Sequence, residues 1–287
     1  MPTLRQVKKR IRSVISTRQI TKAMEMVAAA KLRKAQMRLE QVRPFSEKLD
    51  RVLVSLAAAS GGELVHPFFE KREIKKRTLV LVTADRGLCG SFNTNLINRA
   101  REWLADKDPN QVELVLVGKK GHDFFKKRDY EILDVYKDWN GNLDYGKTRE
   151  LVDMLTERFL NGQTDEIRLI YTRFETMTRY RITEAAYLPV ERPDIEEQET
   201  HLEYIYEPSP EAIFAELMPR YALTKMLTSL ADSFASEHGT RMIAMGAATK
   251  NAGEMIDTLT LQYNKARQAA ITKELLDIVG GAEALRG

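Results

Sequence analysis

Both ends of this chain have the sequence of very long helices, and this feature constrains the fold more than any other. From Thr3 to Ala59 there is no glycine and one proline, Pro44, among good helix formers. From Arg220 to about Val279 there is no proline. Sixty helical residues at 1.5 Å each predict a rod of roughly 90 Å, longer than a compact domain of this size is wide.

Each terminal segment carries an apolar stripe at intervals of three and four residues, the spacing of one helix face. The second stripe is interrupted between Glu237 and Arg241. Two such helices bury their stripes most economically against each other, so we predict an antiparallel coiled coil. The alternative is a compact bundle in which the long helices are broken. Pro44 is expected to kink the first helix unless its missing hydrogen bond is tolerated, and Pro219 to break or bend the second. Ser209, followed by Pro210, is predicted to be the N-cap.

The middle of the chain alternates short apolar runs with helical stretches, which predicts a Rossmann-like α/β domain with a largely parallel sheet. A further run from Tyr180 to Val190 fits an antiparallel edge strand. The expected fold class is therefore α/β plus a long antiparallel coiled coil, with residues 1–60 and 209–287 as the shaft and 75–208 as the globular domain. The predicted strands are residues 78–83, 112–118, 131–136 and 166–174, and the predicted helices are 93–105, 119–127 and 145–160.

Charge is distributed unevenly along the chain. Between Met1 and Lys48 there are thirteen Lys and Arg against three Glu, and between Glu191 and Glu207 seven acids against one Arg. This asymmetry predicts partners of opposite sign at two different places. No run of eighteen apolar residues exists, so no membrane span is expected. The first residues lack a signal peptide's apolar core, and Cys89, the one cysteine, excludes an internal disulfide.

Motifs of catalysis are missing from the sequence. The four histidines have no second histidine or cysteine at metal-ligand spacing, and there is no phosphate-binding P-loop or nucleophile motif. The best candidate site is the segment from Thr83 to Phe92, TADRGLCGSF, between a predicted strand and a helix. Its glycines do not match the dinucleotide-binding pattern, which favours a plain turn with Cys89 packed inside it rather than a reactive thiol. We therefore predict no catalytic residue, no cofactor and no metal.

Four motifs resemble one known family. They are QITKAMEMVAAAKLRKAQ (residues 19–36), DRGLCG (85–90), YEPSP (206–210) and the segment 236–285, which contains RQAAIT. Together they resemble the gamma subunit of the bacterial F-type ATP synthase, and the likeness covers essentially the whole chain. Two rival interpretations are an enzyme built on the α/β domain and a nucleic-acid-binding coiled coil, the latter suggested by the basic N-terminal helix.

The resemblance implies a rotor that catalyses nothing itself. In that family the coiled coil fills the axis of a ring of alpha and beta subunits, and the α/β domain rests, with the epsilon subunit, on the membrane-embedded c-ring. Torque passes between the proton-driven c-ring and the catalytic beta subunits and couples proton translocation to ATP synthesis or hydrolysis. The implied location is peripheral, on the cytoplasmic face of the cell membrane, with no nucleic acid bound and no direct membrane span.

The resemblance also implies contact residues. Those expected to meet the beta subunit are Met24, Arg267, Gln268 and Thr272, and those expected to meet the c-ring or epsilon are Tyr204, Tyr206 and Glu207. The apolar C-terminal end is expected to be buried in a protein sleeve. Gly239, Gly246 and Gly253 recur every seven residues on one helix face, which predicts either a closely approaching helix or a locally compliant shaft.

Overall fold

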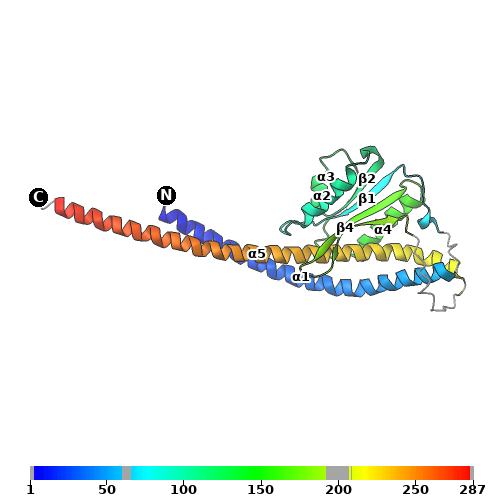
Figure 1. Ribbon diagram of the computed structural model, residues 1–287, viewed down its shortest axis with the longest axis horizontal. Coiled ribbons are helices and arrows are strands. Elements are labelled where there is room, and N and C mark those ends of the chain that lie inside the picture. The colour runs from blue at the N-terminus through cyan, green and yellow to red at the C-terminus, as the bar shows by residue number, and fades with distance from the viewer. Residues whose placement is uncertain (1–2, 60–65, 192–206, 208, 285–287) are drawn as a thin grey trace. The chain divides into compact units, whose positions relative to one another are not determined.

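The computed structural model describes residues 3–59, 66–191, 207 and 209–284. They form two compact units: Met1–Ala28 with Met242–Gly287 is the smaller one, and Ala29–Arg241 is the larger one. Helices α1 (Leu4–Ala59) and α5 (Pro210–Ala284) each contribute to both units (Figure 1). The two predicted long helices are confirmed, and the alternative of broken helices is wrong. The division into a shaft and a globular domain at residues 60, 75 and 209 stays a prediction.

Neither internal proline ends its helix. α1 continues through Pro44 and α5 continues through Pro219. The start of α5 follows from its first residues, because the Ser209 hydroxyl accepts a hydrogen bond from the Ala212 amide at 3.2 Å and Pro210 occupies the first helical position. The predicted N-cap is therefore confirmed.

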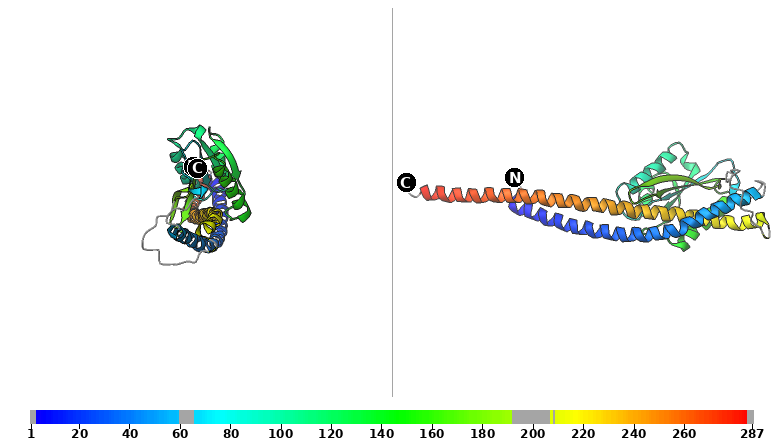
Figure 2. Two further views of the ribbon diagram at one scale, coloured as in Figure 1. Left: turned by 90° about the vertical axis from the view of Figure 1, so that its right-hand side faces the viewer. Right: turned by 60° about the horizontal axis from the view of Figure 1, so that its bottom comes forward.

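In the smaller unit, the two terminal segments lie side by side and antiparallel (Figure 2). Small or short side chains allow close approach at their seam: Thr249 Oγ1 donates to Thr21 Oγ1 at 2.9 Å, and Gly246 faces the Glu25 carboxylate. The C-terminal end of α5 extends past the N-terminal end of α1. The residues buried in this unit include Val7, Ala28, Met245 and Ala252.

The larger unit is built on a five-stranded sheet in the order β3-β2-β1-β4-β5. The first four strands are parallel, and β5 pairs antiparallel with β4 at the edge, as predicted. The strands are β1 (Arg77–Val82), β2 (Val112–Val117), β3 (Glu131–Tyr136), β4 (Glu166–Phe174) and β5 (Tyr180–Leu188), and the helices besides α1 and α5 are α2 (Phe92–Leu104), α3 (Lys119–Phe125) and α4 (Tyr145–Leu160), with single 3₁₀ turns at Pro67–Phe69 and Pro109–Gln111.

Helices cover both faces of this sheet. In β1, Leu79 and Leu81 pack with α2 and α3, whereas Val80 and Val82 belong to a second core shared with α4, α1 and α5. Successive side chains of a strand point to opposite faces, so a strand that is buried on both sides reads as a continuous apolar run. This burial explains the continuous apolar runs Leu79–Val82 in β1 and Leu114–Val117 in β2.

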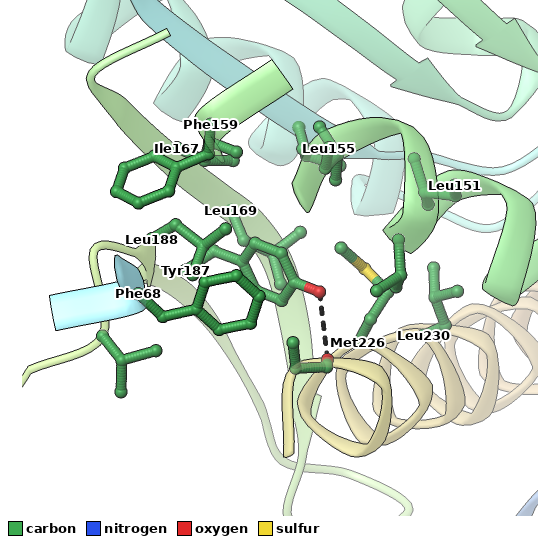
Figure 3. Packing of buried hydrophobic residues seen from close by; sticks show 14 of the residues in the cluster. Phe68, Leu151, Leu155, Phe159, Ile167, Leu169, Tyr187, Leu188, Met226 and Leu230 are labelled. Carbon is green, nitrogen blue, oxygen red and sulfur yellow. Dashed lines mark hydrogen bonds between the residues drawn. The ribbon is translucent and has the colours of Figure 1, made fainter. Parts of the chain in front are cut away.

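Tyr187 of β5 joins the sheet to helix α5. Its ring is 1% exposed, and its hydroxyl donates to the Ala222 carbonyl at 3.0 Å (Figure 3). Met226 and Leu230 of α5 pack in the same cluster, between the sheet and α4. Helix α5 is therefore part of the core of the α/β unit rather than an appendage to it.

A charged clamp links α1, α5 and β4. Arg43 forms an ion pair of 2.7 Å with Asp232 and donates to the Phe174 carbonyl at 3.0 Å, while Asp232 accepts from the Phe174 amide at 3.3 Å. Burial raises the pKa of Asp232, and the Arg43 charge opposes that rise. The clamp fixes the helix pair against the end of β4.

Arg43→Met tests the clamp. Breaking one side of a buried pair costs about 3–5 kcal/mol, and the 34% exposure of Arg43 reduces this, so we expect the free energy of unfolding to fall by about 2 kcal/mol. Urea unfolding followed by circular dichroism measures it. The matched control is Arg220→Met, which breaks an exposed Arg220–Glu216 pair on α5 and should cost less than about 0.5 kcal/mol. Equal losses of unfolding free energy in the two variants would contradict a specific stabilising role of the clamp.

The glycines Gly239, Gly246 and Gly253 leave room for a methyl group. A Cβ would meet its nearest neighbour at 3.7 Å at Gly239 and at 3.6 Å at Gly246, and no described atom lies within 4 Å of a Cβ at Gly253. No neighbouring helix therefore excludes a side chain at these places. Because glycine costs a helix about 1 kcal/mol relative to alanine, a locally compliant α5 stays as the prediction for these positions.

Replacing all three by alanine should raise the melting temperature of the purified chain by about 6–12 °C, since each glycine costs about 1 kcal/mol and each kcal/mol is worth roughly 2–4 °C in a chain of this size. Differential scanning calorimetry gives the value. The contrasting variant is Gly141→Ala, because Gly141 has φ 70° and its Cβ would overlap the His238 ring. That variant should melt at a lower temperature. A triple variant that melts no higher than wild type would contradict the prediction that the three glycines make α5 compliant.

Candidate partner-binding surfaces

Met24 lies on α1 in the smaller unit, and its side chain is half-buried. Two apolar side chains on the same side of the helix are much more exposed, at 57% for Ile20 and 57% for Val27. A cluster of large apolar side chains open to water is typical of a surface that another protein covers. The structure thus supplies an apolar surface around Met24, and the contact of Met24 itself with a partner stays a prediction.

Arg267, Gln268 and Thr272 are all exposed on α5 in the same unit. The Thr272 hydroxyl donates to the Gln268 carbonyl at 3.0 Å, so it is satisfied within the helix, whereas Arg267 forms no ion pair with any described residue. The side chains around and beyond them are apolar and open to water, with exposures from 49% to 67%: Ile271, Leu275, Leu276, Ile278 and Val279. The C-terminal end therefore presents an apolar surface with a polar group beside it.

The basic residues near the N-terminus are also exposed. Arg5, Lys8, Lys9, Arg10 and Arg12 lie on α1, and none forms an ion pair with a described residue. Their charges are therefore available to an acidic partner.

The predicted contacts at the other end of the chain are only partly described. Glu207 is exposed, and Tyr204 and Tyr206 lie outside the described residues. Because two of these three residues are not described, their contact with the c-ring or epsilon stays a prediction.

The loop after β1 lies where open α/β sheets bind ligands, at the carboxyl ends of the strands. In this chain, a carboxylate of the protein itself accepts the backbone hydrogen bonds that could otherwise hold an anionic ligand. The Asp85 carboxylate accepts hydrogen bonds from the amides of Lys119 (3.1 Å), Asp138 (3.2 Å) and Asn140 (2.7 Å). Cys89 is 1% exposed, and burial raises the pKa of its thiol, so the prediction of a packed cysteine is confirmed.

Helix α5 closes the same edge with buried polar side chains. His238 Nε2 is 3.1 Å from the Gly141 carbonyl, and Arg241 pairs with Glu237 at 2.8 Å while donating to the carbonyls of Gly87 and Arg86. Burial lowers the pKa of His238 to about 4 and raises that of Glu237. Sequence reasoning did not foresee these contacts. The feature of the sequence that could have indicated these contacts is the interruption of the apolar stripe between Glu237 and Arg241.

Among the residues that the structure describes, no group of three or more His, Cys, Asp or Glu side chains could hold a metal ion. None of the helices, over its described residues, is long and apolar enough to cross a membrane. What the described surface offers is a set of exposed apolar and charged side chains suited to protein partners.

Comparison with known proteins identifies the family. A family model described as ATP synthase matches residues 3–285. The ATP synthase gamma chain of Moorella thermoacetica is 48% identical over 286 residues, covering 100% of both chains. The ATP synthase gamma chain of Desulforamulus reducens is 46% identical over 285 residues, covering 99% of this chain and 100% of the relative.

Solved structures share the fold. A chain of the Euglena gracilis mitochondrial ATP synthase, in its OSCP/F1/c-ring structure, superimposes with a TM-score of 0.69 at 18% identity, covering 98% of this chain and 94% of that chain. A chain from the central stalk and c-ring structure of the Tetrahymena thermophila mitochondrial enzyme gives 0.61 at 24% identity, covering 80% and 99%. The paired terminal helices, the α/β unit and these full-length relatives agree: the chain belongs to the ATP synthase gamma chain family.

Proposed function

We propose that this chain works as the shaft of a rotary motor. It is the central-stalk subunit of an F-type ATP synthase, and it transmits torque between a proton-driven c-ring and the catalytic beta subunits. The observation that carries the proposal is full-length identity of 46–48% to gamma chains, in a chain whose terminal helices pair. The chain itself has no catalytic role: the sheet edge where an α/β enzyme would bind its ligand is filled by Asp85 and by helix α5.

A shaft must resist twisting and bending under load. One charge crossing roughly 150 mV releases about 3.5 kcal/mol, and several together approach the ~5–15 kcal/mol that holds a domain folded. Each unit supports its helices in its own way. In the smaller unit they brace each other along the Thr21–Thr249 seam, and in the larger unit the Arg43–Asp232 clamp ties them to the sheet.

The exposed surface of the smaller unit supports a rotor that turns inside a sleeve. Apolar side chains at the end of α5, such as Leu276 at 66% and Ile278 at 67% exposed, are stabilised once other subunits cover them. Methionine makes flexible, non-directional contacts, so Met24 suits a contact that slides. We assign Met24, Arg267, Gln268 and Thr272 to contact with the beta subunit.

The remaining partners follow from the same proposal. The alpha and beta subunits surround the paired helices, and the exposed cations from Arg5 to Arg12 attract acidic groups on that ring. We assign Tyr204, Tyr206 and Glu207 to the epsilon subunit and the c-ring. The complex then holds the chain at the cytoplasmic face of the cell membrane as a peripheral subunit.

The proposal is tested by reconstitution with purified alpha and beta subunits of the same organism. A single thiol at the exposed Asp106, introduced as Asp106→Cys with Cys89→Ser, carries a bead, and ATP should drive its rotation in one direction. The rival nucleic-acid-binding function predicts instead that the chain captures DNA, and not these subunits, at moderate salt. A chain that binds DNA and leaves the subunits unbound would contradict the rotor.

Within that complex, Arg267→Ala with Gln268→Ala should lower the ATP hydrolysis rate about tenfold, a loss of about 1.4 kcal/mol in transition-state stabilisation. Both side chains are exposed in the free chain, so its melting temperature should not change. The matched control is Lys250→Ala with Glu254→Ala, an exposed pair on the same helix. Hydrolysis rates that fall equally in both variants would contradict a specific contact at Arg267 and Gln268.

A further inference from the structure

A groove runs between α1 and the turn that joins β4 to β5 in the larger unit. Its volume is about 630 Å³, within the range of roughly 300–1,000 Å³ typical of ligand sites. α1 contributes Leu39, Glu40 and Glu47, and the turn contributes Phe174 and Met177. None of the residues proposed to contact the beta subunit, the epsilon subunit or the c-ring lines this groove.

The walls of the groove are held in place before any partner arrives. Arg43 lines the groove and is bound to Asp232 and to the Phe174 carbonyl, and Asp232 holds the Phe174 amide. These bonds hold the start of the turn, at Phe174, against α1. A preformed site loses less conformational entropy when it binds, which favours recognition of a partner.

Apolar side chains form the floor and one rim. Leu39 and Phe174 are buried, at 4% and 7% exposed, whereas Met177 at the rim is 51% exposed. An exposed methionine at the rim of a groove offers an adaptable apolar contact.

Two carboxylates give the groove its charge. Glu40 and Glu47 are seven residues apart on α1, so they lie on one face about 10.5 Å apart along the helix axis. Both are exposed, and neither forms an ion pair with a described residue. Arg43 is committed to Asp232, and Glu175 on the turn pairs with Arg179. The free charge of the groove is therefore negative, within the N-terminal stretch that is otherwise strongly basic.

The groove is lined by side chains of α1 and of the turn that follows Phe174. We therefore expect a partner to be recognised through side chains. We propose that this groove docks an amphipathic helix of a partner protein that carries two Lys or Arg seven residues apart, with apolar residues between them. The cations reach Glu40 and Glu47, and the apolar residues cover Met177 and the floor.

The test uses the full-length chain and a fluorescein-labelled helical peptide of about 18 residues, built from alanine and leucine with two arginines seven residues apart. A second peptide of the same composition has the arginines five residues apart, on different faces. Fluorescence anisotropy at low salt should show that the first peptide binds about fivefold more tightly than the second, and that salt weakens its binding.

Glu40→Gln with Glu47→Gln should weaken binding of the first peptide about fivefold. The matched control is Glu150→Gln with Glu157→Gln, an exposed pair of glutamates with the same spacing on α4, which should leave binding unchanged. Met177→Arg, which puts a cation at the rim, should also weaken it. All these positions are exposed, so folding is retained.

Other outcomes would overturn the proposal. Equal binding of the two peptides, or equal losses in the groove and control variants, would mean that binding is general attraction to acidic groups. A concentration-dependent dimer that Glu40→Gln with Glu47→Gln abolishes in sedimentation would assign the groove to a second copy of this chain instead. Failure of any of these tests would leave ATP-driven rotation of the reconstituted complex unaffected.

Discussion

The pairing of the two chain ends is the interaction on which the rest of this structure depends. Helices as long as α1 and α5 are not stable in water on propensity alone, so they need a partner along their length. In the smaller unit each is the other's partner, with Thr21 against Thr249 and Gly246 against Glu25. In the larger unit the same two helices also cover one face of the sheet, where Tyr187 binds the Ala222 carbonyl.

Much of this fold could be predicted because its signals are local. Helix formers without interruption predicted α1 and α5, apolar runs predicted the strands, and Ser209 marked a helix start. The effect of Pro44 was harder to predict, because tolerance of a missing hydrogen bond depends on the packing around it. The polar residues from Glu237 to Arg241 interrupted the stripe for a reason that lies far away in the sequence, in the loops around Arg86 and Gly141.

The candidate surfaces also divide into parts that the sequence could predict and parts that it could not. Met24 and Arg267 came from resemblance to a family, and the structure adds only that their surroundings are exposed and apolar. The acidic groove could not be foreseen from sequence, because Glu40 and Met177 meet only after the sheet and the helix pair have formed. Asp85 likewise looked like part of a possible ligand loop, and three backbone amides explain why that loop holds the chain's own carboxylate instead.

The central claim is that the two ends form one seam, and a disulfide across that seam tests it most directly. In a Cys89→Ser background, Thr21→Cys with Thr249→Cys places two thiols where hydroxyl oxygens lie 2.9 Å apart. Mild oxidation should join them rapidly and almost completely within one chain, whereas Thr17→Cys with Thr249→Cys, one helical turn away, should react slowly. Two thiols at positions 21 and 249 that stay free and react independently with a labelling reagent would contradict a paired shaft.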